Sequence, residues 1–296
     1  MSDFLSGYSI QRWLETCPQG YLEDTQFGHQ AGAHEPDAIL DSEALREAAV
    51  RTTVQLVVGE RAALAASSGL VNCAPDYPSK HFLATQTLDE ARHVEIFTQR
   101  LHDLGVKEAD LESTIEHFAN PNLVNFAGVL LEKVNDGDFL AGVVGQNIVL
   151  EGMAFSVFEM MEAGNRDLNP KFAQTLVGTI ADERRHVGFG ENRIGSLVTE
   201  HPERKPEIEA MQREMSYHML KTFSTAFAEG ESSAEEGRKV AQAAGAGTTT
   251  NTKFHGVDMA TASTEQAQAV LEATVVSEFK TRLARIGLEY QAPVGV

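Results

Sequence analysis

The sequence predicts an all-α protein. Apolar residues recur at helical spacing along almost the whole chain of 296 residues, which places them on one face of successive helices. Alternating runs of Val, Ile and Thr between turn residues, which are typical of strands, are nearly absent. Asn, Asp, Ser, Pro and Gly stand between the apolar segments and mark where helices begin and end. Together these observations favour a bundle of helices.

The chain is expected to fold as one domain behind a short arm. Residues 1–40 contain scattered Gly and Pro without a sustained period, and they predict an N-terminal arm with a short helix around Ile10–Glu15. Residues 41–296 are expected to form a single domain. Within it, residues 230–262 are small, polar and rich in Gly and Thr, which predicts a long flexible loop.

The long helices follow from their start and stop signals. Asp41 and Ser42 can cap a helix that ends near Gly69, and Ser79 can cap a second helix that ends at Gly105. The pairs Asn120-Pro121 and Asn169-Pro170 each predict a helix start, because proline in the first turn needs no backbone donor. Further helical segments are expected over residues 107–119, 138–164, 170–200, 203–229 and 264–286.

The composition excludes several classes of partner. Lys and Arg number 24 against 43 Asp and Glu, which gives a formal charge of −19. Phosphate backbones and anionic membranes repel such a chain, so we expect neither nucleic acid nor membrane as a partner. The most apolar stretch, Phe139–Met161, contains Gln146, Asn147, Glu151 and Glu159, and these polar groups favour a buried helix over a membrane span.

The cysteines and the start of the chain predict a cytoplasmic protein. Only Cys17 and Cys73 occur, without the Cys-x-x-Cys spacing of a thiolate metal site, and two cysteines suit a reducing compartment. The first residues show no basic segment followed by an apolar run, so no signal peptide is expected.

The pattern Asp-Glu-x-Arg-His occurs twice, at residues 89–93 and 182–186. One Glu-x-x-His carries little information, but two copies of the five-residue form are a strong signal. Residues three apart lie on the same helix face, so Glu90 with His93, and Glu183 with His186, can each bind one metal ion.

A lone glutamate precedes each motif inside an apolar helix. Glu60 lies 30 residues before Glu90, and Glu151 lies 32 residues before Glu183. A separation of about 30 residues lets the chain run along half a helix, make a turn and return to the same level in an antiparallel helical hairpin. Two related hairpins, 41–105 and 138–200, are therefore expected to bring each lone glutamate level with a motif.

The alternative for each glutamate is a structural one. An unpaired buried carboxylate is costly, and either glutamate could pair with a buried arginine such as Arg61, Arg92 or Arg185. For Glu60 or Glu151 taken alone, the two interpretations have equal weight. Four glutamates and two histidines in this order favour a metal site.

This ligand pattern resembles that of the ferritin-like di-iron carboxylate proteins. The motif is most similar to that of the hydroxylase subunits of bacterial multicomponent monooxygenases, and the order and size also resemble ribonucleotide reductase small subunits and R2-like oxidases. The resemblance covers about residues 41–200. It implies a ferritin-like four-helix bundle with additional helices and a pair of iron ions, or a manganese–iron pair, held by six catalytic ligands. One ion would be held by Glu60, Glu90 and His93, and the other by Glu151, Glu183 and His186, with Glu90 and Glu183 bridging.

The other motif residues are expected to support the ligands. Asp89 and Asp182 are placed to hold the far ring nitrogen of a ligand histidine across the bundle. Arg92 and Arg185 could balance these aspartates, with an ordinary buried ion-pair network as the alternative.

The resemblance does not single out one subfamily. Four positions differ from residues typical of the radical-forming reductases, the R2-like oxidases, the hydroxylases and the aryl-amine N-oxygenases, respectively. These positions are Phe97, Gln146, Phe155 and Thr179.

A substrate cavity beside the ligands is one of two interpretations of the glycines on the ligand helices. Aromatic and aliphatic residues share the ligand helices with glycines, which could either open a cavity or allow close helix packing. The residues in question are Phe126, Leu130, Val143, Val144, Phe155, Phe158 and Phe189, with Gly142, Gly145, Gly152, Gly188 and Gly190.

The resemblance implies an O2-dependent di-iron oxidoreductase, an oxidase or monooxygenase. Such an enzyme would hydroxylate, desaturate or N-oxygenate a small apolar organic substrate. Because the chain carries no nucleotide-binding motif, an external electron donor such as a reductase or ferredoxin is expected, and we also expect a homodimer. The alternatives are a radical-generating subunit of the ribonucleotide reductase type and a ferritin-like iron storage protein.

Overall fold

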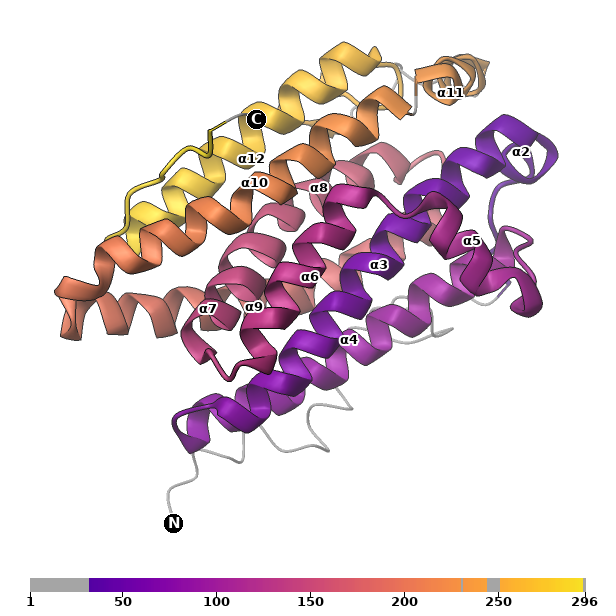
Figure 1. The fold of residues 1–296 in the computed structure, drawn as a ribbon. Helices are drawn as coiled ribbons and strands as arrows, with labels where there is room; N and C mark the ends of the chain where they lie inside the picture. The colour runs from indigo at the N-terminus through magenta and orange to yellow at the C-terminus, as the bar shows by residue number, and fades with distance from the viewer. Residues whose placement is uncertain (1–31, 230, 244–250, 295–296) are drawn as a thin grey trace.

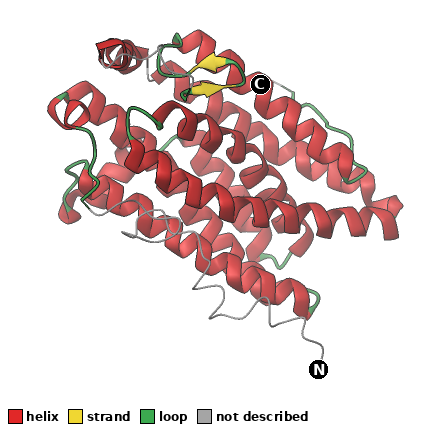
Figure 2. Ribbon diagram, turned by 180° about the vertical axis from the view of Figure 1, so that it is seen from behind, coloured by secondary structure: helices red, strands yellow, loops and turns green. Residues whose placement is uncertain are grey.

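The computed structural model describes residues 32–229, 231–243 and 251–294. The all-α prediction is confirmed, since helices form nearly all of the regular structure in these residues (Figure 2). The helices are α2 Asp37–Asp41, α3 Glu43–Cys73, α4 Tyr77–Asp103, α5 Leu111–Phe118, α6 Pro121–Asn135, α7 Phe139–Val143, α8 Glu151–Asn165, α9 Pro170–Glu200, α10 Lys205–Glu229, α11 Glu231–Ala243 and α12 Thr264–Arg285. Short 3-10 helices cover Glu108–Asp110 and Pro202–Arg204, and a π-helix covers Val144–Leu150. Strands β1 Lys253–Phe254 and β2 Val257–Asp258 form an antiparallel hairpin.

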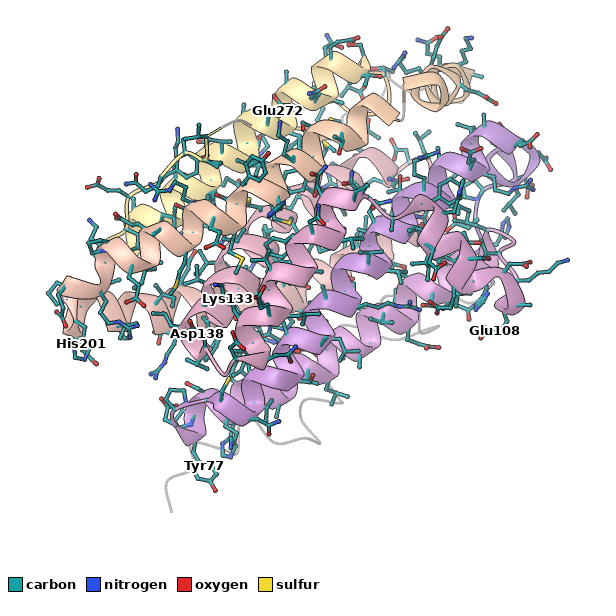
Figure 3. All side chains as sticks on the ribbon, viewed as in Figure 1. Tyr77, Glu108, Lys133, Asp138, His201 and Glu272 are labelled. Atoms are coloured by element: carbon teal, nitrogen blue, oxygen red, sulfur yellow. The ribbon has the colours of Figure 1, made fainter. Side chains whose placement is uncertain are left out.

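Four helices form the central bundle. Helices α3 and α4 lie side by side as one hairpin, and α8 and α9 form a second hairpin, as predicted (Figure 1). Helix α9 also packs against α4 and thereby joins the two hairpins. Figure 3 shows the labelled side chains of Tyr77 and Glu108 at opposite ends of the α3–α4 pair.

Several predicted helix starts are confirmed by their caps. The side chains of Ser42, Asn120 and Asn169 accept hydrogen bonds from backbone N–H groups in the first turns of α3, α6 and α9. The predicted cap of α4 is wrong. Asp76 accepts from the Ser79 N–H at 2.8 Å, so α4 begins at Tyr77 and Ser79 lies within its first turn.

The apolar segment before the second motif is not one uniform α-helix. The π-helix Val144–Leu150 interrupts it immediately before Glu151, and all seven residues of this turn are buried. Single π-turns inside helices often occur at functional sites. In the described part of the chain, Phe139–Asn165 is the one helix long and apolar enough to cross a membrane, and 89% of its most apolar window is buried inside the protein.

Two apolar clusters lie at different levels along the bundle. One cluster contains Ala63 and Leu70 of α3 together with Leu83 of α4 and Ile194 of α9. The other contains residues beyond the ligand positions on the same helices, among them Val57, Phe97 and Leu176. On α3, α4 and α9 the predicted ligands fall between the two clusters, so the fold places a polar layer inside an apolar core.

Additional helices surround this layer. Helix α10 packs against α6 and the π-helix, and α12 packs against α8 (Figure 1). Both outer helices therefore cover the segment that carries Glu151.

The predicted long loop is partly wrong. Residues 231–243 form α11, which packs against α3, and residues 253–258 form the β-hairpin. The 13 residues of α11 include Ala, Glu, Arg and Lys, which have a high helix propensity. The high share of Gly and Thr in the rest of the stretch obscured this signal. Residues 230 and 244–250 lie outside the described residues, and the flexibility of 230–262 stays a prediction.

The N-terminal arm is described only from residue 32, so the expected helix at 10–15 lies outside the described residues. The end of the arm is anchored to the bundle. Glu35 is buried, and it accepts hydrogen bonds from Arg100 Nε at 2.9 Å and from Asn169 Nδ2 at 2.7 Å. Residues 35–41 therefore belong to the folded domain.

Candidate metal centre

The structure brings all six predicted ligands into one buried layer. Each of the four bundle helices contributes: Glu60 lies in the middle of α3, Glu151 is the first residue of α8, and α4 and α9 carry the two Glu-x-x-His motifs. None of the six residues is more than 5% exposed. The predicted level alignment of lone glutamates and motifs is confirmed.

The six residues form two overlapping groups. In the first group, ligand atoms of Glu60, Glu90, His93 and Glu183 lie within 4.8 Å of one another. In the second group, the same holds for Glu90, Glu151, Glu183 and His186. Glu90 and Glu183 belong to both groups, and they are the two carboxylates that the family resemblance implies as bridges.

The spacing of the ligand atoms suits metal ions. His93 Nδ1 lies 3.4 Å from a carboxylate oxygen of Glu60, 3.4 Å from one of Glu90 and 3.3 Å from one of Glu183. His186 Nδ1 lies 3.2 Å from Glu90 Oε1, 3.4 Å from Glu183 Oε2 and 3.8 Å from Glu151 Oε1. Metal–ligand bonds of about 2.0–2.2 Å separate neighbouring ligand atoms by roughly 3.0–3.5 Å.

Several of these atoms have no hydrogen-bond partner. Within the described residues, the unpartnered buried atoms include Nδ1 of both His93 and His186, Glu90 Oε2 and Glu183 Oε2. Buried polar atoms are normally satisfied, and each exception needs an explanation. Two metal ions would satisfy all four, so the residues present fit a dinuclear centre.

The two motifs support each other across the bundle, as predicted. His93 Nε2 lies 3.2 Å from Asp182 Oδ2, and His186 Nε2 lies 3.1 Å from Asp89 Oδ2. With Nε2–H donating to an aspartate, the Nδ1 lone pair of each ring points toward the glutamates. Arg185 contacts both aspartates at 2.7 Å, and Arg92 pairs with both as well. The arginines therefore balance the aspartates rather than Glu60 or Glu151.

Burial and mutual charge shift the pKa values of the ligands. Burial raises the pKa of Glu60 to about 8 and raises that of Glu151 well above its usual range. Burial opposes the charged form of Glu90, yet His186 and His93 hold its pKa well below the usual range. For His93 and His186, burial alone would lower the pKa, but the surrounding carboxylates raise both values well above the usual range. Without metal, the layer therefore holds protons at neutral pH.

Three buried amides beside Glu151 were not predicted as part of the site. Gln86, Gln146 and Asn147 all donate hydrogen bonds to the Glu151 carboxylate. The sequence contained a signal, because Gln146 and Asn147 are polar residues in the most apolar stretch of the chain. Gln86 lies four residues before Glu90 and therefore on the ligand face of α4.

An apolar pocket of about 320 Å³ opens onto the layer. Glu60, Glu90, Glu151 and Glu183 form one end, and the pocket follows α3 from Ala63 back to Ala48. The 15 residue steps from Ala48 to Ala63 span about 22 Å of helix. Most of the remaining wall is apolar. The π-helix and α6, α8, α10 and α12 contribute Leu123, Leu150, Ala154, Val157, Phe158, Met160, Met161, Met219, Phe223 and Leu271.

The pocket does not lie beside most of the residues that could have bordered a cavity. Of those aromatic and aliphatic residues, only Phe158 lines the pocket. Gly142, Gly145 and Gly190 serve close packing instead, because an added Cβ would lie 2.5–2.8 Å from Leu70, Leu130 and Asn147, respectively. The pocket lies at Gly59, where an added Cβ meets nothing within 4 Å.

Comparisons with known proteins agree with this architecture. The chain matches no protein-family model and no curated protein by sequence. It is similar to the solved structure of "Protein 19 with aldehyde deformylating oxidase activity from Synechococcus", at 17% identity and a TM-score of 0.63, over 84% of this chain and 94% of that one. It is also similar to an "R2-like ligand-binding oxidase with aerobically reconstituted metal cofactor after photoconversion", at 18% identity and a TM-score of 0.66, over 83% of both chains. At these identities the likeness shows the fold: the protein is a ferritin-like helical bundle, as predicted.

Proposed function

We propose that the protein is a non-haem di-iron oxidase that uses O2 to oxidise a small apolar organic substrate. The observation that carries the proposal is the contact between the carboxylate–histidine layer and the apolar pocket, whose end is formed by four of the six predicted ligands. The names of the two similar structures, an aldehyde deformylating oxidase and a ligand-binding oxidase, support the same class.

The two overlapping groups of ligand atoms support two metal positions. Glu60 and His93 would hold one ion and Glu151 and His186 the other, with Glu90 and Glu183 between them. Carboxylate and imidazole ligands suit iron and manganese. When bound, a pair of such ions supplies the redox chemistry that O2 activation requires.

The other side chains prepare the site. Asp182 and Asp89 orient the two histidines, and the Arg92–Arg185 pair neutralises the aspartates. The apolar pocket excludes water from the layer and orients a substrate by its shape. The reaction would be a hydroxylation, a desaturation or an N-oxygenation, with electrons from an external reductase or ferredoxin.

The pocket favours an oxidase over the two alternatives. A radical subunit needs a redox-active side chain near the metals, but Phe97 is fully buried in an apolar cluster, and no tyrosine among the described residues lines the pocket. An iron store needs a polar route for many ions, whereas this pocket is apolar along most of its length.

The test begins with metal-free protein that is loaded with two equivalents of ferrous iron without oxygen. On mixing with O2, we expect the protein to consume about one O2 per metal pair, without a tyrosyl radical signal in paramagnetic resonance. A panel of aliphatic, aromatic and amine substrates should contain compounds that are converted to oxygenated or desaturated products. A mineral of many irons per chain would identify a storage protein, and a persistent radical would identify a radical subunit.

A further inference from the structure

We propose that Gln86, Gln146 and Asn147 form an amide clamp that holds Glu151 in one position and makes the two metal positions unequal. The position at Glu151 and His186 is then preorganised and fills first, while the position at Glu60 and His93 has the movable carboxylate. This inference rests on the metal centre of the proposed function, and it concerns how that centre is loaded.

The clamp engages both oxygens of the Glu151 carboxylate. Gln86 Nε2 donates to Oε1 at 2.6 Å and Gln146 Nε2 donates to the same oxygen at 3.2 Å. Asn147 Nδ2 donates to Oε2 at 3.0 Å. Three hydrogen bonds to its two oxygens restrict the rotation of the Glu151 carboxyl group.

The amides are themselves fixed by neighbouring helices. Gln146 also donates to the Ala63 carbonyl of α3 at 3.1 Å. Asn147 donates to Gln86 Oε1 on α4 at 3.0 Å and to the His186 carbonyl on α9 at 3.3 Å. All three amide side chains are fully buried. Glu151 is therefore tied to every other helix of the central bundle.

The local backbone makes this arrangement possible. Within the π-helix, the Glu151 N–H donates to the Gln146 carbonyl five residues earlier, so the widened turn lets residues 146 and 147 both reach Glu151. Gly190 on α9 provides the space, because an added Cβ there would lie 2.5 Å from Asn147 Cβ.

The other half of the layer lacks an equivalent clamp. The positions five and four residues before Glu60 are Gln55 and Leu56. Gln55 donates to the carbonyls of Arg51 and Phe118 and accepts from the Asn120 N–H, so its amide is engaged elsewhere. Thr179, four residues before Glu183, donates to the Thr175 carbonyl. No side-chain amide in the described residues donates to Glu60, which borders the open space at Gly59.

The consequence is an order of metal binding. A ligand that is already held in place loses little freedom when an ion binds, whereas Glu60 must be ordered by the ion itself. We expect two binding steps whose dissociation constants differ by at least tenfold, with the tighter step at Glu151 and His186.

The experiment is a titration of the metal-free, full-length protein with Mn²⁺ followed by paramagnetic resonance, repeated with Co²⁺ followed by visible absorption. His186→Ala should remove the tighter step and His93→Ala the weaker one, which assigns each step to its position. Gln146→Met and Asn147→Leu keep the side-chain volume, and each should weaken the tighter step at least tenfold and leave the weaker step within threefold. Gly190→Ala, which displaces Asn147 without removing an amide, should act in the same direction.

The matched control is Gln212→Leu, which removes another buried amide, on α10, that bonds to Ser216 and the Gln291 N–H. This change should leave both steps unaltered. Equal affinities in the unaltered protein, or equal weakening of both steps by the clamp variants, would overturn the clamp but leave the dinuclear centre standing. Binding of fewer than two ions to the unaltered protein would instead overturn the metal centre, and with it the proposed function.

Discussion

His93 on α4 and Asp182 on α9 are joined across the bundle, with His93 Nε2 3.2 Å from Asp182 Oδ2. Each residue belongs to a different copy of the same five-residue motif, and the reverse pair, His186 with Asp89, completes the exchange at 3.1 Å. Neither motif is thus complete alone, because each supplies the aspartate that orients the histidine of the other. The bundle must be assembled before either metal position exists.

The first prediction concerns this exchange. Asp182→Asn should weaken metal binding roughly 10–100-fold, because the His93 ring loses the acceptor that fixes its orientation. Metal titration of the purified variant measures the effect. Asp103→Asn is the control, since Asp103 pairs with Lys171 away from the layer, and it should bind metal like the unaltered protein. An Asp182→Asn protein with unchanged affinity would contradict the assignment of Asp182.

A second prediction separates the shared carboxylate from peripheral ones. Glu183 belongs to both ligand groups, so Glu183→Ala should lose most of both ions. Plasma emission on the purified protein measures the metal content. Glu203→Ala removes an exposed carboxylate and should retain two ions per chain. Retention of two ions by the Glu183 variant would refute the site.

The pocket yields a third prediction. Gly59→Leu should fill part of the pocket, because an added Cβ there meets open space, and substrate oxidation should fall at least roughly tenfold. Metal content should stay at two ions, since Gly59 contacts the pocket rather than the histidines. Gly188→Leu is the matched control, as Gly188 also has open space but does not line the pocket. Equal turnover in both variants would place the substrate elsewhere.

The pKa values predict how the stability of the metal-free protein depends on pH. Glu60 has an ordinary pKa of 4.5 and a value of about 8 when folded, and His93 and His186 are raised well above their ordinary 6.5. The folded protein therefore binds more protons than the unfolded chain from about pH 4.5 upward, and stability falls as pH rises through the folded pKa values. Glu90, whose pKa is lowered, gives the opposite slope only below its ordinary value of 4.5.

We expect the melting temperature of metal-free protein to drop by roughly 5 °C or more between pH 5.5 and pH 8. Differential scanning calorimetry of the unaltered protein and of Glu60→Gln measures this, and the variant should show a shallower slope. Added metal should reverse the trend, since metal ions compete with protons for the same atoms. A metal-free protein that becomes more stable as pH rises over this window would show that the buried layer is not protonated.

The sequence by itself determined the parts of this protein that depend on local geometry. Glu90 and His93 share a helix face because residues three apart always do. Glu60 lies level with them because its separation of 30 positions from Glu90 suffices for the rest of one helix, a turn and the return along the next helix. Helix starts at Asn120 and Asn169 followed from capping chemistry, which acts within three residues. These features require no knowledge of which helices become neighbours.

Only the tertiary structure decided which side chains meet across the bundle. Gln86 reaches Glu151 from 65 residues away, and Gly190 makes room for Asn147 on another helix. The pocket lies along α3 at Gly59, whereas Gly142 and Gly145 allow close packing, although all three are glycines in apolar helices. A helical pattern gives the face that a residue occupies but not the partner that covers this face. That partner depends on helix packing over the whole chain, which a local pattern does not contain.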